Sequence, residues 1–223
     1  MAKLYFRYGA MGCGKTRDIM KVWYNYKEKG KDAIVIKPGI DTKGNDKIVS
    51  RDNSELKTDY IIRKTDNIYD IISKHKIKYN LDCILVDEAQ FLERHHIEEL
   101  TDVCDDLDIT VMCYGLRADF KDNLFPGSAA LFAYADVIEE MKTICECMDG
   151  ATRNVRFVNG KPVFQGEQVA IDGKDEVTYI SMCRKCRKKL VKEYNKKMSD
   201  KKSYDDKKSP SNRIRMVMNN ITK

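Results

Sequence analysis

The sequence of 223 residues predicts an α/β fold, with a mostly parallel sheet flanked by helices and a small additional region of β-strands. Short apolar runs alternate with segments of helical spacing up to about residue 142, which is typical of a parallel sheet covered on both faces. Beyond residue 143, alternating residues and glycine turns indicate short ribbons instead. We therefore expect an α/β domain over residues 1–142, a small β domain over residues 143–190 and a basic, flexible tail over residues 191–223.

The strands of the expected parallel sheet are short apolar runs that end in polar or turn residues. The clearest is CILV at residues 83–86, because it is wholly apolar and is followed by two acidic residues. The other expected strands cover residues 4–8, 33–36, 60–62, 110–114 and 137–138. In the small domain, residues 155–163, with a turn at Asn159-Gly160, and residues 177–180 predict ribbon strands.

Helices are expected between the strands of the sheet. Ile19, Met20, Trp23 and Tyr26 recur at helical spacing, and Gly30 suits the end of that helix. Further helices are expected from about residue 68, over residues 94–107 and over residues 128–134. Residues 41–56 are polar and weakly patterned, which predicts a loop.

The segment GAMGCGKT at residues 9–16 fits the phosphate-loop pattern G-x-x-x-x-G-K-[ST], between an expected strand and an expected helix. Its members are Gly9, Ala10, Met11, Gly12, Cys13, Gly14, Lys15 and Thr16. The glycines let backbone N–H groups wrap a polyphosphate, Lys15 can meet its outer phosphates, and Thr16 can bind the bridging Mg²⁺. The chain is therefore predicted to bind a nucleotide.

Two acidic residues follow the strand expected at residues 83–86. An aspartate in this position of a phosphate-loop protein usually holds Mg²⁺, so Asp87 is the predicted ligand; a simple strand cap is the alternative. Glu88 can face the acceptor and take the proton of an attacking hydroxyl or water. That role would suit a kinase or an ATPase, and DEAQ at residues 87–90 also resembles the D-E-x-x box of helicases.

Cys145 and Cys147 are separated by 35 residues from Cys183 and Cys186. Two close pairs on two turns can form a tetrahedral, structural zinc site in a ribbon-like domain, although the first pair is one residue closer than usual. Free thiols and a redox pair are the alternatives. The cysteines in apolar segments are expected to be buried hydrophobic residues: Cys83, Cys104 and Cys113.

The positive charge of the chain is concentrated at its C-terminal end. The net charge is +6, and residues 184–223 carry 15 Lys/Arg and 4 Asp/Glu, whereas the other residues carry 26 and 31. Such a tail can attract nucleic acid, but it is more often a solvated end, so we expect no nucleic-acid partner. No run approaches the roughly 20 apolar residues of a membrane span, and no signal peptide is visible, so a cytoplasmic protein is expected.

The order of these features resembles the cellular (type II) thymidine kinase family, in which a P-loop, RecA-like domain adjoins a zinc domain that carries a substrate lasso. The resemblance covers most of residues 3–188. Its matching segments are the phosphate loop, KPGID (37–41), DEAQF (87–91), YGLRADF (114–120), FPG (125–127) and both cysteine pairs.

The resemblance implies ATP-dependent phosphorylation of thymidine to thymidine 5′-monophosphate, with Glu88 as the general base. It also implies that Asp87 and Gln90 join the phosphate loop in binding ATP. The residues implied at the substrate are Met11, Asp41, Phe91, Leu116, Phe120, Phe125 and Tyr179, the last in the lasso that closes over the nucleoside. Mg²⁺, structural Zn²⁺, a homotetramer and feedback inhibition by thymidine triphosphate are implied as well.

Three places depart from the family pattern. Lys43 occupies a position where the family commonly has an arginine, and Asn154 occupies one where it often has a threonine of the pocket. The segment at residues 172–177 is about one residue longer than is usual in the family. A nucleic-acid-stimulated ATPase, with the zinc ribbon as its binding module, is the second hypothesis, but it would need further motor motifs. A non-catalytic zinc-ribbon protein is the third, and the intact phosphate loop and acidic pair argue against it.

Overall fold

The computed structural model describes residues 1–41, 44–168 and 176–208, with side chains as far as residue 200. Within that part of the chain, the largest sheet has six strands, and all of its pairings are parallel. Its order is β5-β2-β6-β7-β1-β8. These strands are β1 (Leu4–Tyr8), β2 (Ala33–Pro38), β5 (Tyr60–Ile62), β6 (Cys83–Val86), β7 (Thr110–Gly115) and β8 (Val137–Glu140). The predicted mostly parallel sheet is confirmed.

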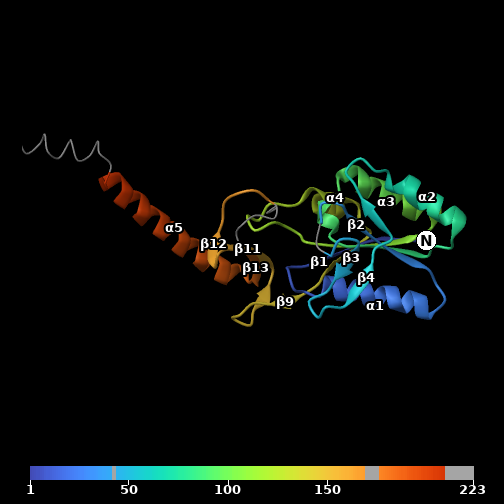
Figure 1. The fold of residues 1–223 in the computed structure, drawn as a ribbon, viewed down its shortest axis with the longest axis horizontal. Helices are drawn as coiled ribbons and strands as arrows, with labels where there is room; N and C mark the ends of the chain where they lie inside the picture. Colours follow the sequence, from blue (N-terminus) through green and yellow to red (C-terminus); the bar gives the residue numbers. More distant parts are fainter. Residues whose placement is uncertain (42–43, 169–175, 209–223) are drawn as a thin grey trace, which may run out of the picture.

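Helices cover both faces of this sheet, as Figure 1 shows. The helices α2 (Ile68–Lys78), α3 (Arg94–Leu107) and α4 (Pro126–Tyr134) lie on one face, and α1 (Lys15–Glu28) lies on the other. Alternate strand residues supply two cores, because successive side chains point to opposite faces. In β2, Ile34 and Ile36 belong to the core under α2 and α3, whereas Ala33 and Val35 belong to the core under α1.

A hairpin interrupts the segment that was expected to be a loop, residues 41–56. Its strands are β3 (Lys47–Val49) and β4 (Glu55–Lys57), and Ile48 pairs with Leu56. Ile48 is 2% exposed and packs in the same core as Ile19 and Val22 of α1. The prediction of a loop was wrong because each strand contributes only one large inward-facing side chain, which is too short a pattern to recognise.

The chain beyond β8 forms small antiparallel sheets. Its strands are β9 (Thr143–Ile144), β10 (Gly150–Ala151), β11 (Arg153–Val158), β12 (Lys161–Val163) and β13 (Val177–Met182). The order β12-β11-β13 confirms the ribbons that the sequence predicts. The turn between β11 and β12 uses Asn159 and Gly160, both with positive φ, as a two-residue hairpin loop requires.

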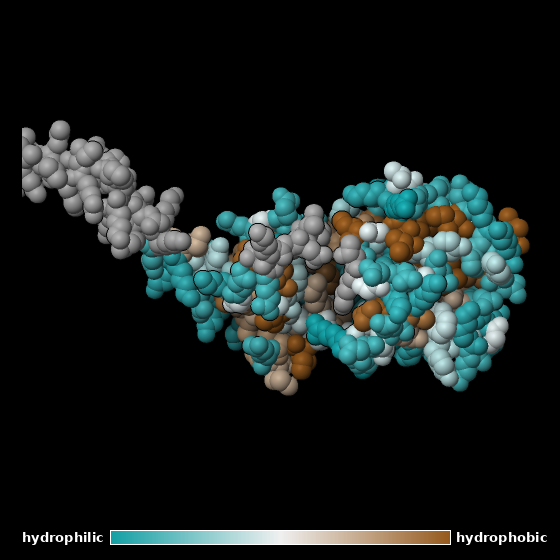
Figure 2. All heavy atoms as spheres, viewed as in Figure 1, coloured by the Kyte–Doolittle hydropathy of each residue, from teal (hydrophilic) through white to brown (hydrophobic). Residues whose placement is uncertain are grey.

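Helix α5 (Arg184–Lys208) occupies the start of the segment that was expected to be a flexible tail from residue 191. The helix extends because residues 184–208 contain no glycine or proline and many good helix formers. Phe164 and Tyr194 make one contact at its base, with ring centroids 5.2 Å apart. The side chains of α5 described up to residue 200 are mostly hydrophilic (Figure 2), and the helix projects from the small sheets.

Several expectations concern residues that lie outside the described part of the chain. These are Lys43, most of the lasso segment at residues 172–177, and the tail beyond residue 208. Among the described residues, every helix is too short or too polar to cross a bilayer.

The start of α4 packs closely against a short 3₁₀ helix, η1 (Ala89–Phe91), that follows β6. A Cβ at Gly127 would lie 2.4 Å from the carbonyl oxygen of Ala89 and 2.9 Å from that of Gln90. Backbone oxygens cannot move aside as a flexible side chain can, so only glycine fits here.

We expect Gly127→Ala to lower the free energy of unfolding by about 1–3 kcal/mol, the usual range for overpacking. Thermal or urea denaturation measures the effect. Gly150→Ala is the matched control, because no atom lies within 4 Å of a Cβ built there. Equal stability of the two variants would contradict this account of the α4–η1 contact.

Candidate active site

The phosphate loop connects β1 to α1, and its glycines give it its shape. Gly12 and Gly14 have φ angles of +79° and +87°, in the left-handed region that favours glycine. A Cβ at Gly9 would lie 2.4 Å from the sulfur of Cys13, so a side chain there would open the turn. The Gly9 N–H donates to the carbonyl of Gly115 at 3.2 Å, which fixes the loop to the end of β7.

Lys15 keeps its ammonium group inside this loop. The residue is 7% exposed, and its Nζ lies 3.4 Å from the carbonyl oxygen of Ala10 and 3.7 Å from the sulfur of Cys13. Both contacts are long, so the ammonium is available to a stronger acceptor such as a phosphate oxygen. Half-buried Thr16 follows in the first turn of α1, where unpaired N–H groups attract anions.

Asp87 leaves β6 at the same edge of the sheet as the phosphate loop, because β6 and β1 run parallel through β7. Burial raises the pKa of the Asp87 carboxyl, and the charge of Glu88 raises it further. The Glu88 N–H and the ammonium of Lys15 act in the opposite direction, whereas Asp41 raises the pKa. A buried carboxyl among these charges fits a divalent cation, whose charge would replace the lost solvation.

Glu88 is held in an unusual conformation. Its φ is +48°, although it is not glycine, and its carboxylate accepts a hydrogen bond from the side-chain N–H of Gln90. Gln90 is fully buried, and its carbonyl oxygen accepts the Leu116 N–H at 3.0 Å. A single buried amide therefore bonds the end of β6 to the end of β7. Each polar group of the Gln90 side chain thus has a partner in the protein, and the ATP contact expected of this residue stays a prediction.

Two aromatic residues of the predicted substrate set meet beside η1. The rings of Phe91 and Phe125 are 5.5 Å apart and nearly perpendicular, and Phe125 is 4% exposed. Phe91 also lines a cavity of about 290 Å³, together with Ile40, Ile62 and residues around them. Leu116, Phe120 and Phe125 are buried but do not line that cavity.

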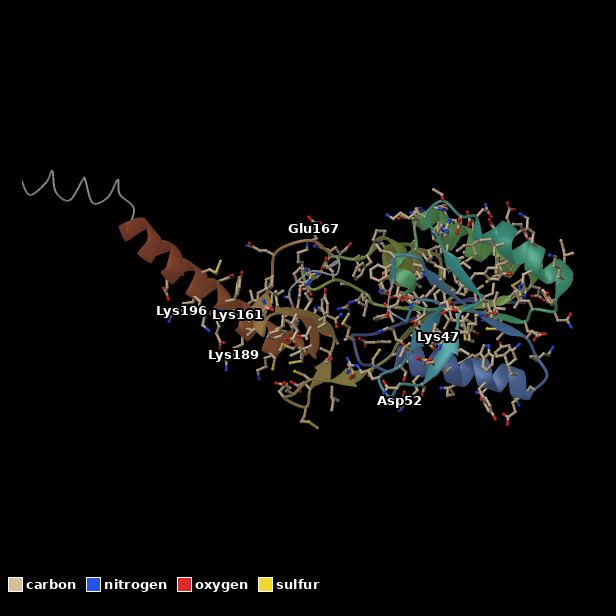
Figure 3. All side chains as sticks on the ribbon, viewed as in Figure 1. Lys47, Asp52, Lys161, Glu167, Lys189 and Lys196 are labelled. Carbon is tan, nitrogen blue, oxygen red and sulfur yellow. The ribbon has the colours of Figure 1, made fainter. Side chains whose placement is uncertain are left out.

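Arg156 of β11 joins the other predicted substrate residues, and sequence analysis missed it. Its guanidinium carbon lies 3.8 Å from the ring centroid of Phe120, and its Nε donates to the hydroxyl of Tyr179 at 2.8 Å. Its two terminal nitrogens donate to the carbonyls of Glu167 and Gln168, each at 2.9 Å; Figure 3 labels Glu167. The arginine is 5% exposed and so forms a buried link between Phe120, β13 and the segment before residue 169.

Asn154 lies two residues before Arg156, on the same face of β11. Its side-chain oxygen accepts the Met11 N–H at 2.8 Å, which attaches the small sheet to the phosphate loop. The signal for both residues was present in the sequence: polar side chains at alternate positions of a strand whose neighbour Val155 is apolar. The Asp41 carboxylate accepts a hydrogen bond from the buried ammonium of Lys37 at 3.3 Å.

The four cysteines of the two pairs come together. The sulfur atoms of Cys145, Cys147, Cys183 and Cys186 all lie within 4.8 Å of one another, and those of Cys147 and Cys183 are 3.6 Å apart. Tetrahedral zinc with bonds of about 2.3 Å would separate its sulfur ligands by about 3.8 Å, so the cluster could hold zinc. Backbone N–H groups of Cys147 and Cys183 lower the pKa of the Cys145 thiol, whereas the neighbouring thiols raise the pKa of Cys186, so one thiolate forms first and shares its charge with the other sulfurs. The other predicted buried cysteines, Cys83, Cys104 and Cys113, are at most 3% exposed.

A parallel sheet that brings a glycine-rich phosphate loop and an acidic pair to one edge defines the class of P-loop nucleotide-binding proteins. Comparison with known families narrows this class. The family model described as thymidine kinase matches residues 2–187, so the chain belongs to the thymidine kinase family.

Individual relatives agree with the family match. The chain is 45% identical to the thymidine kinase of Enterococcus faecalis over 188 residues, which cover 83% of this chain and 94% of the relative. It is 45% identical to that of Lactiplantibacillus plantarum, over 82% of this chain and 94% of the relative. It is 44% identical to the thymidine kinase of Rhodopirellula baltica, over 82% of this chain and 87% of the relative. Membership of this family makes the protein a phosphotransferase, not the ATPase or the non-catalytic module of the alternative hypotheses.

If the cysteine cluster holds zinc, metal analysis should find about one zinc per chain in the purified protein and none in Cys183→Ser. Cys104→Ala is the control, because Cys104 is a buried cysteine of α3 that does not belong to the cluster. This variant should keep the zinc content of the wild type. Zinc in equal amount in both variants would contradict the prediction.

Gln90→Met tests whether the buried amide supports Glu88 or binds ATP. The change keeps the volume of the side chain but removes both hydrogen bonds. Support of Glu88 predicts a loss of roughly ten- to a hundredfold in kcat, with little change in the KM for ATP. A rise in KM for ATP at unchanged kcat would instead favour the ATP contact. Thermal denaturation should accompany the kinetics, to separate misplacement from unfolding.

Proposed function

We propose that this protein transfers the γ-phosphoryl group of ATP to the 5′-hydroxyl of thymidine, giving thymidine 5′-monophosphate. The printed name of its relatives, thymidine kinase, supports this substrate. The observation that carries the proposal is the carboxylate of Glu88, which is fixed by a buried amide one residue after the buried Asp87. A kinase needs a proton acceptor at this point beside the phosphates.

Phosphoryl transfer depends mainly on positioning and on stabilising charge on the phosphoryl oxygens. In our proposal, the phosphate loop and Lys15 bind the polyphosphate, while Thr16 and Asp87 hold Mg²⁺, which would neutralise part of its charge. Glu88 takes the proton of the attacking hydroxyl. The ring contacts of the aromatic residues and the link from Arg156 to Tyr179 support a pocket for the base at this end of the sheet.

The remaining substrate residues are proposed from the family resemblance. Met11, Leu116, Phe91 and Phe120 would line the pocket around the thymine ring, and Phe125 would lie behind them. Asp41 would lie on the phosphate side, and Tyr179 would belong to the lasso that excludes water from the reacting groups.

We also propose the organisation that the sequence predicts: catalysis by residues 1–142 and substrate closure by residues 143–190. Zinc would hold the second part together by joining its two turns. The family resemblance further supports a cytoplasmic homotetramer that thymidine triphosphate inhibits.

The direct test is an assay of purified protein with ATP, Mg²⁺ and thymidine, in which the nucleoside monophosphate is measured. Glu88→Gln should lose at least about two orders of magnitude in kcat, since the amide cannot accept the proton, but it should still bind ATP. Glu28→Gln is the control, because this glutamate is exposed at the end of α1.

Failure of the wild-type protein to phosphorylate thymidine or deoxyuridine would overturn the proposed function. Near-normal turnover by Glu88→Gln would leave the function standing but remove the role of Glu88.

A further inference from the structure

The tip of the β3–β4 hairpin lies against the phosphate loop. A Cβ built at Gly12, in the middle of the loop, would lie 2.8 Å from Nη1 of Arg51 and 3.1 Å from its guanidinium carbon. The whole guanidinium plane is therefore next to the backbone that shapes the phosphate site. Arg51 makes no ion pair within the described part of the chain, so its charge is not committed to a carboxylate there.

Several contacts hold the hairpin tip in this position. Asp52 pairs with Arg17 in the first turn of α1 and accepts the hydroxyl of Ser50; Figure 3 shows Asp52 beside the start of α1. The bond from Arg17 and then that from Ser50 lower the pKa of the Asp52 carboxyl, as expected for a carboxylate paired with a guanidinium. Within the tip, the Ser50 N–H donates to the carbonyl of Ser54 at 2.9 Å.

The other end of the hairpin is attached as well. The ammonium of Lys37, at the end of β2, donates to the carbonyl of Lys47 at 3.3 Å. Both the N–H and the hydroxyl of Thr58 donate to the carbonyl of Asp46. Ile48 is buried against α1 between these attachments. Arg51 is therefore carried by an anchored element rather than by a free loop.

The charges around the site leave a need for such a group. Asp87 is 4% exposed and Glu88 follows it directly, while Lys15, 7% exposed, is the cation that the phosphate loop itself supplies. A polyphosphate adds several negative charges to this region. A guanidinium suits phosphate oxygens particularly well, because its planar fork donates two parallel hydrogen bonds.

We propose that Arg51 is a phosphate-binding residue of the active site, which donates to the phosphate chain of ATP bound in the loop. This inference rests on the proposed use of ATP. In the nucleotide complex, the exposed guanidinium needs only to turn from Gly12 onto the phosphates that the same loop wraps. Lys15 then binds from within the loop and Arg51 binds from the hairpin side.

The test compares Arg51→Ala and Arg51→Lys with Lys57→Ala. Lys57 is exposed on the same hairpin and lies opposite Lys47 in the strand register, at the end remote from the tip. Its replacement by alanine removes one positive charge, as Arg51→Ala does. Equilibrium binding of an unreactive ATP analogue and of thymidine is measured alongside kcat and KM. Loss of a charged hydrogen bond should raise the dissociation constant of the analogue at least about tenfold in Arg51→Ala. Arg51→Lys should recover part of the loss, and Lys57→Ala and thymidine binding should be unchanged.

Analogue binding within twofold of wild type in Arg51→Ala, or an equal loss in Lys57→Ala, would overturn the proposal. Asp52→Ala releases the hairpin tip without removing the guanidinium, so it should weaken binding of the analogue less than Arg51→Ala does. A larger loss of binding in Asp52→Ala than in Arg51→Ala would also contradict the proposal. Because the analogue reports binding without any acceptor, the role of Arg51 can be judged even if thymidine proves not to be the substrate.

Discussion

The buried amide of Gln90 is the contact on which the rest of the site depends. It joins Glu88, beyond β6, to the backbone of Leu116, beyond β7. Gly115 keeps the space around it, because a Cβ at Gly115 would lie 2.8 Å from the amide oxygen of Gln90. An unpaired amide in a fully buried position would cost about 1–3 kcal/mol, so both bonds must form together. The position of the carboxylate is therefore a consequence of how two neighbouring strands end.

Attachment of the small sheets to this framework follows a different principle, because polar contacts rather than a shared apolar core make the junction. Asn154 bonds to the backbone of Met11, and Arg156 stacks on Phe120. Arg187, at the start of α5, adds a bond to the carbonyl of Phe120 at 2.8 Å. Each contact reaches a residue of the phosphate loop or of the segment after β7. The junction between the two parts of the molecule therefore includes hydrogen bonds and a cation–π contact.

The sequence was sufficient to predict the parallel sheet, the limits of helices such as Arg94–Leu107, the phosphate loop and the meeting of four cysteines. These features depend on local pattern: continuous apolar runs, helical spacing and fixed motifs. The hairpin at Lys47–Lys57 was not predicted because its pattern is too short. The helix after residue 191 was not predicted because its highly charged sequence is also typical of a solvated tail. The bonds from Gln90 to Leu116 and from Arg156 to Tyr179 could not be predicted, since these partners lie 26 and 23 residues away in the sequence and are brought near only by strand order.

Helix α5 has a consequence for the shape of the molecule. Its 25 residues would span about 37 Å at the usual rise of 1.5 Å per residue, and Figure 1 shows most of that length clear of the body. Frictional drag depends on the longest dimension more than on mass. A single chain should therefore sediment more slowly than a compact sphere of 25.8 kDa. A molecular mass calculated from its hydrodynamic radius, on the assumption of a sphere, would be too large.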